Sequence, residues 1–246
     1  MVRCKNCEHT FEGNFCPNCG QNAHEHRINL YYFIHDIPHS IFHVDGAFFS
    51  TLKGLFTKPG VVIGEFLEGK RMKYFRPFAY VMVMTAICTL LVKILDYLKL
   101  KLILYYDPSY SLQAHGSFFE HYFSVFIFLM IPFASLVTWL FFFKNKYNFW
   151  EHFLANTYIG AQLNLILILT NLINIAGILI SKQNFEVNFT LSTTLFMMLF
   201  LYLYGRVFGY LMHTFYNQIT LILLLTIMNL VLFYLYSFGL QLAGIN

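Results

Sequence analysis

Five apolar stretches, each long enough to cross a lipid bilayer, constrain this chain more than any other feature. They cover approximately residues 78–98, 123–143, 153–180, 191–213 and 218–240. A hydrocarbon core about 30 Å thick needs about 20 apolar residues in a helix. Only 11% of the residues are charged, too few to coat a soluble globule of 246 residues. The sequence therefore predicts an all-α polytopic membrane protein with about five transmembrane helices.

The charged residues are concentrated at the start of the chain. Residues 1–77 hold nine of the 16 Lys and Arg and seven of the 12 Asp and Glu. We divide the chain into a zinc ribbon at 1–21, a segment of amphipathic helices with a basic linker at 22–77, and a transmembrane domain at 78–246. Within the middle segment we expect short helices at 46–57 and 60–69, separated at Pro59-Gly60. The third apolar stretch is long enough to tilt or to break in two.

The orientation follows from the distribution of Lys and Arg around the apolar stretches. Cytoplasmic loops carry an excess of these residues. Basic residues precede the first stretch (70–76) and follow the second (Lys144 and Lys146), whereas the opposite loops carry Lys99, Lys101 and Lys182. No apolar signal segment opens the chain. We expect a cytoplasmic N-terminus and, with five spans, a C-terminus on the far side.

Two cysteine pairs form the strongest motif. Cys4-x-x-Cys7 and Cys16-x-x-Cys19 each turn tightly enough to aim two sulfurs at one ion, and Gly20 suits the second turn. Zinc takes four thiolates at about 2.3 Å. Eight residues separate the pairs, which leaves room for one small hairpin. So short a segment has no core, so metal binding has to drive its folding. We predict a structural zinc ribbon with a β-hairpin, because four cysteines leave no open catalytic position.

The head and the first span together resemble a known family. The ribbon is followed by HVDGAFFSTLKGLFTKPGVVIGEFLEGKRMKYFRPFAY, with Asp45-Gly46, Pro59-Gly60 and Gly69-Lys70-Arg71 among the matching elements. This is similar to the DUF3667 family of uncharacterised bacterial membrane proteins, and the similarity covers most of residues 4–160. The resemblance implies a bacterial inner-membrane location. It implies no activity.

Several polar groups compete as functional sites. Four cations precede the first stretch: Lys70, Arg71, Lys73 and Arg76. They are candidates for binding anionic lipid headgroups, and the alternative is that they only set the topology. His35, His39 and His43 have the spacing of one helix face and are candidate metal ligands, but Pro38 interrupts that helix. Asn148 and Glu151 fit a helix N-cap. Glu151 and His152 are neighbours in sequence and so do not face each other as an acid–base pair.

Polar residues inside the apolar stretches form a second group of candidates. The third stretch carries a stripe of small and amide residues: Asn156, Gly160, Asn164, Asn171 and Asn174. This stripe serves interhelical hydrogen bonding or lines a solute path. Arg206 shares a helix face with Tyr202 and Tyr210. An intramembrane arginine is a functional candidate, and we expect it to face the interior and pair with polar groups.

These patterns favour a membrane protein whose zinc ribbon is a cytoplasmic interaction or assembly module. We expect the lipid bilayer and another protein as its partners. Nucleic acid is disfavoured because the charges of the head are mixed, with Arg3 and Lys5 against Glu8 and Glu12. The alternative is a transporter or channel for a small solute or lipid, lined by the amides and Arg206. We expect no enzyme activity, because no HExxH, GxSxG or P-loop motif is present.

Overall fold

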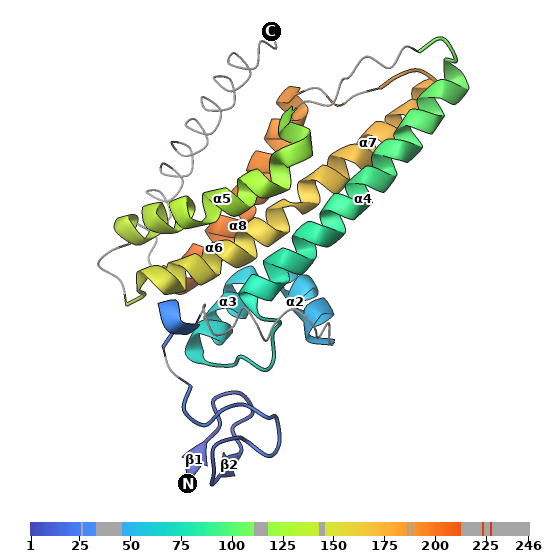
Figure 1. Ribbon diagram of the computed structural model, residues 1–246. Coiled ribbons are helices and arrows are strands. Elements are labelled where there is room, and N and C mark those ends of the chain that lie inside the picture. Colours follow the sequence, from blue (N-terminus) through green and yellow to red (C-terminus); the bar gives the residue numbers. More distant parts are fainter. Residues whose placement is uncertain are drawn as a thin grey trace.

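The computed structural model describes residues 1–25, 27–32, 46–110, 118–142, 146–185, 187, 189–212, 223 and 227. A small head at the N-terminus lies at one end of an elongated body of helices (Figure 1). The predicted span at 218–240 falls outside the described residues, apart from two isolated helical positions.

The head is built on a two-stranded antiparallel sheet. Strands β1 (Val2–Arg3) and β2 (Thr10–Phe11) pair with Val2 opposite Phe11 and Arg3 opposite Thr10. The predicted hairpin is present, but it encloses the first cysteine pair instead of lying between the two pairs. The second pair is closed by a separate bridge between Phe15 and Asn22. The connection between β1 and β2 is so short that the first cysteine knuckle takes up most of it.

Two short helices connect the head to the body, as predicted. Helix α2 (Gly46–Thr57) and helix α3 (Pro59–Glu68) meet at Lys58. Pro59 opens α3, where its missing N–H costs nothing. Gly69 ends α3 in the left-handed conformation, with φ of 109°. Glycine adopts this conformation without strain, so the chain can turn back toward the head.

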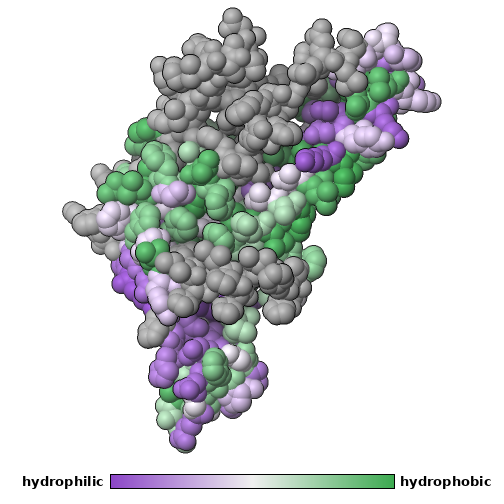
Figure 2. All heavy atoms as spheres, in the orientation of Figure 1, coloured by the Kyte–Doolittle hydropathy of each residue, from purple (hydrophilic) through white to green (hydrophobic). Residues whose placement is uncertain are grey.

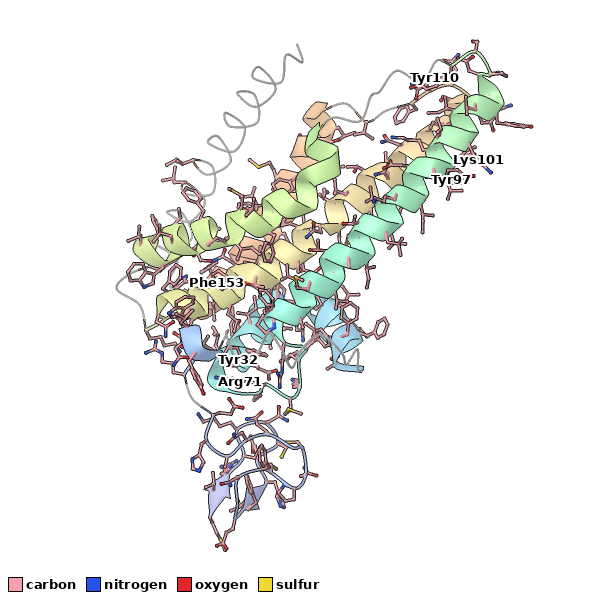
Figure 3. All side chains as sticks on the ribbon, in the orientation of Figure 1. Tyr32, Arg71, Tyr97, Lys101, Tyr110 and Phe153 are labelled. Carbon is pink, nitrogen blue, oxygen red and sulfur yellow. The ribbon has the colours of Figure 1, made fainter. Side chains whose placement is uncertain are left out.

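Helix α4 (Pro77–Tyr106) is longer than the predicted span at 78–98. The sequence predicts a loop at Lys99 and Lys101, but both lie within the continuous helix α4. Lys99 Nζ is 3.7 Å from the Asp96 carboxylate, and Lys101 Nζ is 4.9 Å from the centre of the Tyr97 ring. Figure 3 places this lysine and tyrosine near the end of α4 farthest from the head. Long cationic side chains near a helix end reach polar surroundings without ending the helix.

Four further helices complete the body. They are α5 (Phe118–Phe141), α6 (Phe149–Leu163), α7 (Leu165–Ser181) and α8 (Phe189–Met212). Helices α6 and α7 replace the long third stretch, which is interrupted at Asn164. Helix α4 packs along both of them, α5 packs on α6, and α8 packs on α3. The start of α4, the start of α6 and the end of α8 lie at the same end of the body as the head (Figure 1).

Three helices in the described part of the chain are long and apolar enough to cross a membrane. They are Pro77–Tyr106, the α6–α7 unit Phe149–Ser181, and Thr194–Leu211 of α8. The apolar part of α5, Ile127–Phe141, is shorter. Hydrophobic residues cover the helical body in Figure 2, and hydrophilic residues gather on the head and at the far end of α4. This distribution is consistent with a membrane protein; the predicted count of five spans is not confirmed.

Candidate metal centre and the contacts around it

The four cysteines of the head converge on one point. Their sulfur atoms all lie within 4.8 Å of one another. Cys4 Sγ is 3.5 Å from Cys19 Sγ, and Cys7 Sγ is 3.5 Å from Cys16 Sγ. No disulfide joins them. Four sulfurs about 2.3 Å from one ion at tetrahedral corners lie about 3.8 Å apart. The residues therefore fit a tetrahedral metal ion.

The two knuckles have matching backbone geometry. The N–H of Glu8 donates to the carbonyl of Cys4 at 2.9 Å, and the N–H of Gly20 donates to the carbonyl of Cys16 at 2.8 Å. Glu8 and Gly20 both have positive φ, 62° and 74°. The sequence predicts this role for Gly20. It does not predict it for Glu8, because a glutamate rarely adopts a left-handed conformation. Each knuckle is thus closed by the residue four positions after its first cysteine.

The surroundings of the cysteines shift their pKa values in opposite directions. A hydrogen bond from the backbone of His9, helped by Asn18, lowers the pKa of Cys7 to about 6. Burial raises the pKa of Cys19 to about 12. The surroundings of Cys7 therefore favour the thiolate, whereas burial of Cys19 favours the thiol. Metal affinity at such a site depends on pH, because binding releases protons.

Gln21 joins the metal centre to the rest of the protein. It is two residues after Cys19 and only 2% exposed. Its side-chain Nε2 donates to the carbonyl of Gly69 at 2.7 Å, and its Oε1 accepts from the N–H of Arg71 at 3.2 Å. The carbonyl of Gln21 also accepts from the N–H of Cys16 at 2.8 Å. One residue therefore bonds both to the second knuckle and to the loop that leads into α4.

A second contact binds the same loop to the linker after the ribbon. Arg71 forms an ion pair with Glu25, and its guanidinium lies 4.8 Å from the centre of the Tyr32 ring. Figure 3 shows Tyr32 and Arg71 together between the head and the first helices of the body. Both members of the ion pair are largely buried, which strengthens their attraction relative to an exposed pair.

The basic cluster before α4 is mostly paired within the protein. Lys70 and Lys73 each bond to the Glu65 carboxylate, at 2.9 Å and 2.6 Å, and Tyr74 donates to it at 2.5 Å. Burial raises the pKa of Glu65, but the hydrogen bonds from Lys73, Tyr74 and Lys70 outweigh burial and lower it to about 2. Arg76 is the N-cap residue of α4. Three of the four predicted headgroup-binding cations therefore already have carboxylate partners.

Glu151 connects the linker to the start of α6. Its carboxylate accepts hydrogen bonds from Arg27 Nε at 2.9 Å and from the second guanidinium nitrogen at 2.8 Å. It also accepts from the N–H of Asn148 at 2.7 Å, while Asn148 Oδ1 accepts from the N–H of Glu151 at 2.9 Å. This is the predicted capping interaction, in the form of a full capping box. Arg27 as the partner was not predicted.

Of the amide stripe, only Asn156 makes interhelical hydrogen bonds with described residues. Its Nδ2 donates to Thr138 of α5 at 3.0 Å, and its Oδ1 accepts from the Tyr204 hydroxyl of α8 at 2.6 Å. Asn164 and Asn171 instead donate to carbonyls four residues earlier in their own helix segment. The stripe therefore joins α5, α6 and α8 at one level. It does not gather its amides around a single path.

The Glu151-His152 pair has no catalytic geometry. His152 is buried and lies nearly parallel to two phenylalanine rings that also stack on each other, with ring centres 6.3 Å from Phe142 and 5.7 Å from Phe208. Its ring nitrogens have no hydrogen-bond partner within the described ranges. Glu151 faces Arg27 instead. The predicted histidine trio at 35, 39 and 43 lies outside the described residues.

Arg206 lies on the face of α8 that packs against α3, and its side chain is exposed. We expect Arg206 to face the interior and to pair with amides of the third stretch or with Tyr side chains, but its side chain is exposed. The interior face of this helix instead presents Leu203, Tyr204, Val207 and Phe208. Tyr202, one turn earlier, donates its hydroxyl to the carbonyl of Phe56 at 2.7 Å. Tyr210, one turn later, packs against Gly60 and Gly64 of α3. The predicted candidate face is thus a helix–helix contact.

The segment that connects the head to the body matches the model of a known family. Residues 45–89 match the model of a family described as a protein of unknown function, DUF3667. This range covers α2, α3 and the first part of α4, so the predicted resemblance is confirmed there. It includes Glu65, Gly69 and Arg71, the residues that receive the ribbon or border its contact. The comparisons with curated proteins and with solved structures found no match.

Proposed function

We propose that this protein, whose residues 45–89 match the DUF3667 family model, is a multi-pass protein of the bacterial inner membrane whose zinc ribbon is a cytoplasmic interaction and assembly module. The observation that carries the proposal is the contact of Gln21 with Gly69 and Arg71. It joins a metal-dependent fold directly to the loop that enters the first apolar helix. Zinc is the expected ion because it favours tetrahedral sites with four thiolates.

The surface of the ribbon supports a protein as the partner. The loop at Gly69–Arg71 contacts the head through Gln21, and the head also carries an apolar side chain that is exposed to solvent. Phe15, directly before the second knuckle, is 64% exposed. Arg3 and Glu8 pair at 2.6 Å on the same head, so the charge there is balanced. Balanced charge disfavours a nucleic-acid backbone, and an exposed aromatic residue suits a protein surface.

The orientation rests on where the basic residues lie in the fold. Lys70, Arg71 and Lys73 precede α4, and Lys146 precedes α6. The two helices start at the head end of the body (Figure 1). A predominance of Lys and Arg at this end supports its assignment to the cytoplasm. Impermeant labelling of single cysteines placed at residue 1 and on the loop at 107–110 tests this assignment: only the loop should react in intact cells.

The module function is tested by separating metal binding from docking. Cys16→Ser removes a metal ligand, and Gln21→Ala keeps the ligands but breaks the docking contact. Cys88→Ser is the matched control, because Cys88 is a buried thiol of α4 outside the ribbon. We expect about one zinc per chain in the wild type, in Gln21→Ala and in the control, and a loss of zinc in Cys16→Ser.

Partner capture after crosslinking in membranes gives the second readout. Proteins captured by the wild type and by Cys88→Ser should be lost with Cys16→Ser. If the zinc-free variant retains the same captured proteins at the same yield, the ribbon is not the interaction module. If the purified protein contains no zinc and remains folded, the metal assignment itself is wrong.

A further inference from the structure

A pocket of about 400 Å³ lies where the start of α3 meets the end of α8. Pockets for small ligands have volumes of about 300–1,000 Å³. Lys58 and Arg206 contribute two cationic side chains to its wall, Tyr210 contributes a ring, and the remainder is Val61 and glycines. Both cations are exposed, so the pocket is open at the surface of the protein.

Contacts on either side of Arg206 fix the two helices against each other. Tyr202 bonds to the carbonyl of Phe56, the last turn of α2. A side chain at Gly60 would overlap the backbone carbonyl of Arg206 and would lie 2.5 Å from Tyr210 Cβ. One at Gly64 would lie 2.6 Å from the Tyr210 ring. The backbone of α3 therefore touches α8 directly, and this contact holds Lys58 beside Arg206.

The charge of the pocket is positive and uncompensated. None of the described residues that line it is acidic. Within the described ranges, neither Lys58 nor Arg206 forms an ion pair, whereas Arg27, Lys70, Arg71 and Lys73 all do. Two like charges held at one opening repel each other, and an anion between them removes that repulsion. An arginine also offers several N–H donors in a planar fork that matches phosphate.

We propose that this pocket binds a phosphate group. The position of Arg206 fits the phosphate of a membrane lipid. Arg206 precedes Leu211, the last residue of the candidate span in the described part of α8, by five residues. At 1.5 Å per residue this is about 8 Å of helix, at the end of the body that carries the head. Guanidinium groups at this depth reach the headgroup layer.

The test uses the purified full-length protein in a nonionic detergent. Three ligands are titrated: short-chain phosphatidylglycerol, the matching diacylglycerol without phosphate, and inorganic phosphate. Retained lipid is counted by native mass spectrometry, and ligand stabilisation is followed as a shift in Tm. The variants are Lys58→Gln, Arg206→Gln and the double change. Lys53→Gln, an exposed lysine of α2 outside the pocket, is the matched control.

We expect phosphatidylglycerol to bind the wild type and the control equally. Each pocket variant should bind it about fivefold more weakly, and the double variant about 25-fold, since a basic residue near an anionic surface contributes about 1 kcal/mol. Arg206→Lys, which keeps the charge, should lie between wild type and Arg206→Gln. Competition by inorganic phosphate would identify a site for free phosphate as well as for lipid, and no competition would assign it to lipid alone; both outcomes support the proposal.

Three outcomes overturn the proposal. The first is a double variant that elutes as the wild type does and binds phosphatidylglycerol with unchanged affinity. The second is equal binding of diacylglycerol and phosphatidylglycerol by the wild type. The third is a wild type that responds to neither phosphate-bearing ligand.

Discussion

The side chain of Gln21 donates a 2.7 Å hydrogen bond to the backbone carbonyl of Gly69, 48 residues further along the chain. Its oxygen accepts from Arg71 in the same loop. A glutamine amide can donate and accept at once, so it bonds to two backbone groups that no longer pair within α3. Gly69 is buried, and its carbonyl also accepts from the N–H of Arg71 at 3.0 Å, so Gln21 bonds to both ends of a contact within the loop.

Replacing Gln21 by alanine should loosen the head without emptying the metal centre. The change removes the hydrogen bonds to the Gly69 carbonyl and the Arg71 N–H, each worth about 0.5–1.5 kcal/mol, and leaves those two groups only their 3.0 Å bond to each other. We expect faster hydrogen exchange at the N–H of Arg71 and an unchanged zinc content. Gln183→Ala, an exposed glutamine at the far end of α7, is the control. Unchanged exchange at Arg71 would show that the head is held elsewhere.

Glu65 should make stability depend on pH in acid. Its pKa is about 2 in the folded protein, against 4.5 in an unperturbed chain. A lowered pKa stabilises the fold fully above about pH 4.5, and this contribution is lost as the pH falls toward 2. The shift corresponds to at most about 3 kcal/mol. Glu65→Gln should therefore destabilise the protein at neutral pH. Below pH 4.5 the difference in unfolding free energy between the variant and the wild type should become smaller.

The control for this measurement is Glu68→Gln, which removes an exposed carboxylate of the same helix. Cysteine ligands also become protonated in acid, so each variant is compared with wild type at the same pH. A gap between Glu65→Gln and wild type that stays constant from pH 7 to pH 3 would contradict the assigned ionisation.

Tyr204 and Asn156 should act as one hydrogen-bonded unit between α6 and α8. Tyr204→Phe removes the donor and leaves Asn156 Oδ1 without it, which should cost about 0.6–1.7 kcal/mol in a membrane helix bundle. Denaturation of the purified protein in mixed micelles measures this. Tyr202→Phe removes a hydroxyl from the same helix on its exposed side, and we expect a smaller loss. Equal losses of stability in the two variants would show that the buried hydrogen bond contributes no more than the exposed one.

Gly60 and Gly205 should respond oppositely to alanine. A Cβ at Gly60 overlaps the carbonyl of Arg206, which cannot rotate away, whereas a Cβ at Gly205 meets nothing within 4 Å. Gly60→Ala should force α3 from α8 and destabilise the protein by about 1–3 kcal/mol. Gly205→Ala should be neutral, or stabilising by up to about 1 kcal/mol through helix propensity. Thermal unfolding of both variants decides, and a neutral Gly60→Ala would contradict the close contact.

Features set by local chemistry could be predicted from the sequence. The cysteine pairs, the two short helices around Pro59 and the N-cap at Asn148 each depend on residues within a few positions of one another. The extent of α4 could not be predicted in this way. Lys99 and Lys101 suggest a loop in the sequence, but both lie within α4. There Lys99 lies beside Asp96 and Lys101 lies over the Tyr97 ring.

The partners of the charged residues also lay beyond the sequence. Lys70, Arg71 and Lys73 form a conspicuous cluster, but their carboxylate partners are Glu65 and Glu25, which only the fold brings close. Arg206 was expected inside because a charge in an apolar stretch is costly. In the structure Arg206 instead lies where α8 packs on α3, and its side chain is exposed near the end of the helix.

The ion pair between Arg27 and Glu151 joins residues 124 positions apart, and this separation sets an order of events during synthesis. The ribosome releases the chain from its N-terminus, so all four cysteines are available before Gly69 exists. Gln21 can then dock as soon as the α3–α4 loop emerges. Arg27 must wait until α4 and α5 have been made and α6 has begun at the head end of the body. This ion pair therefore closes after Gln21 has docked, and only in a nascent chain whose first two long helices have returned to the side where they started.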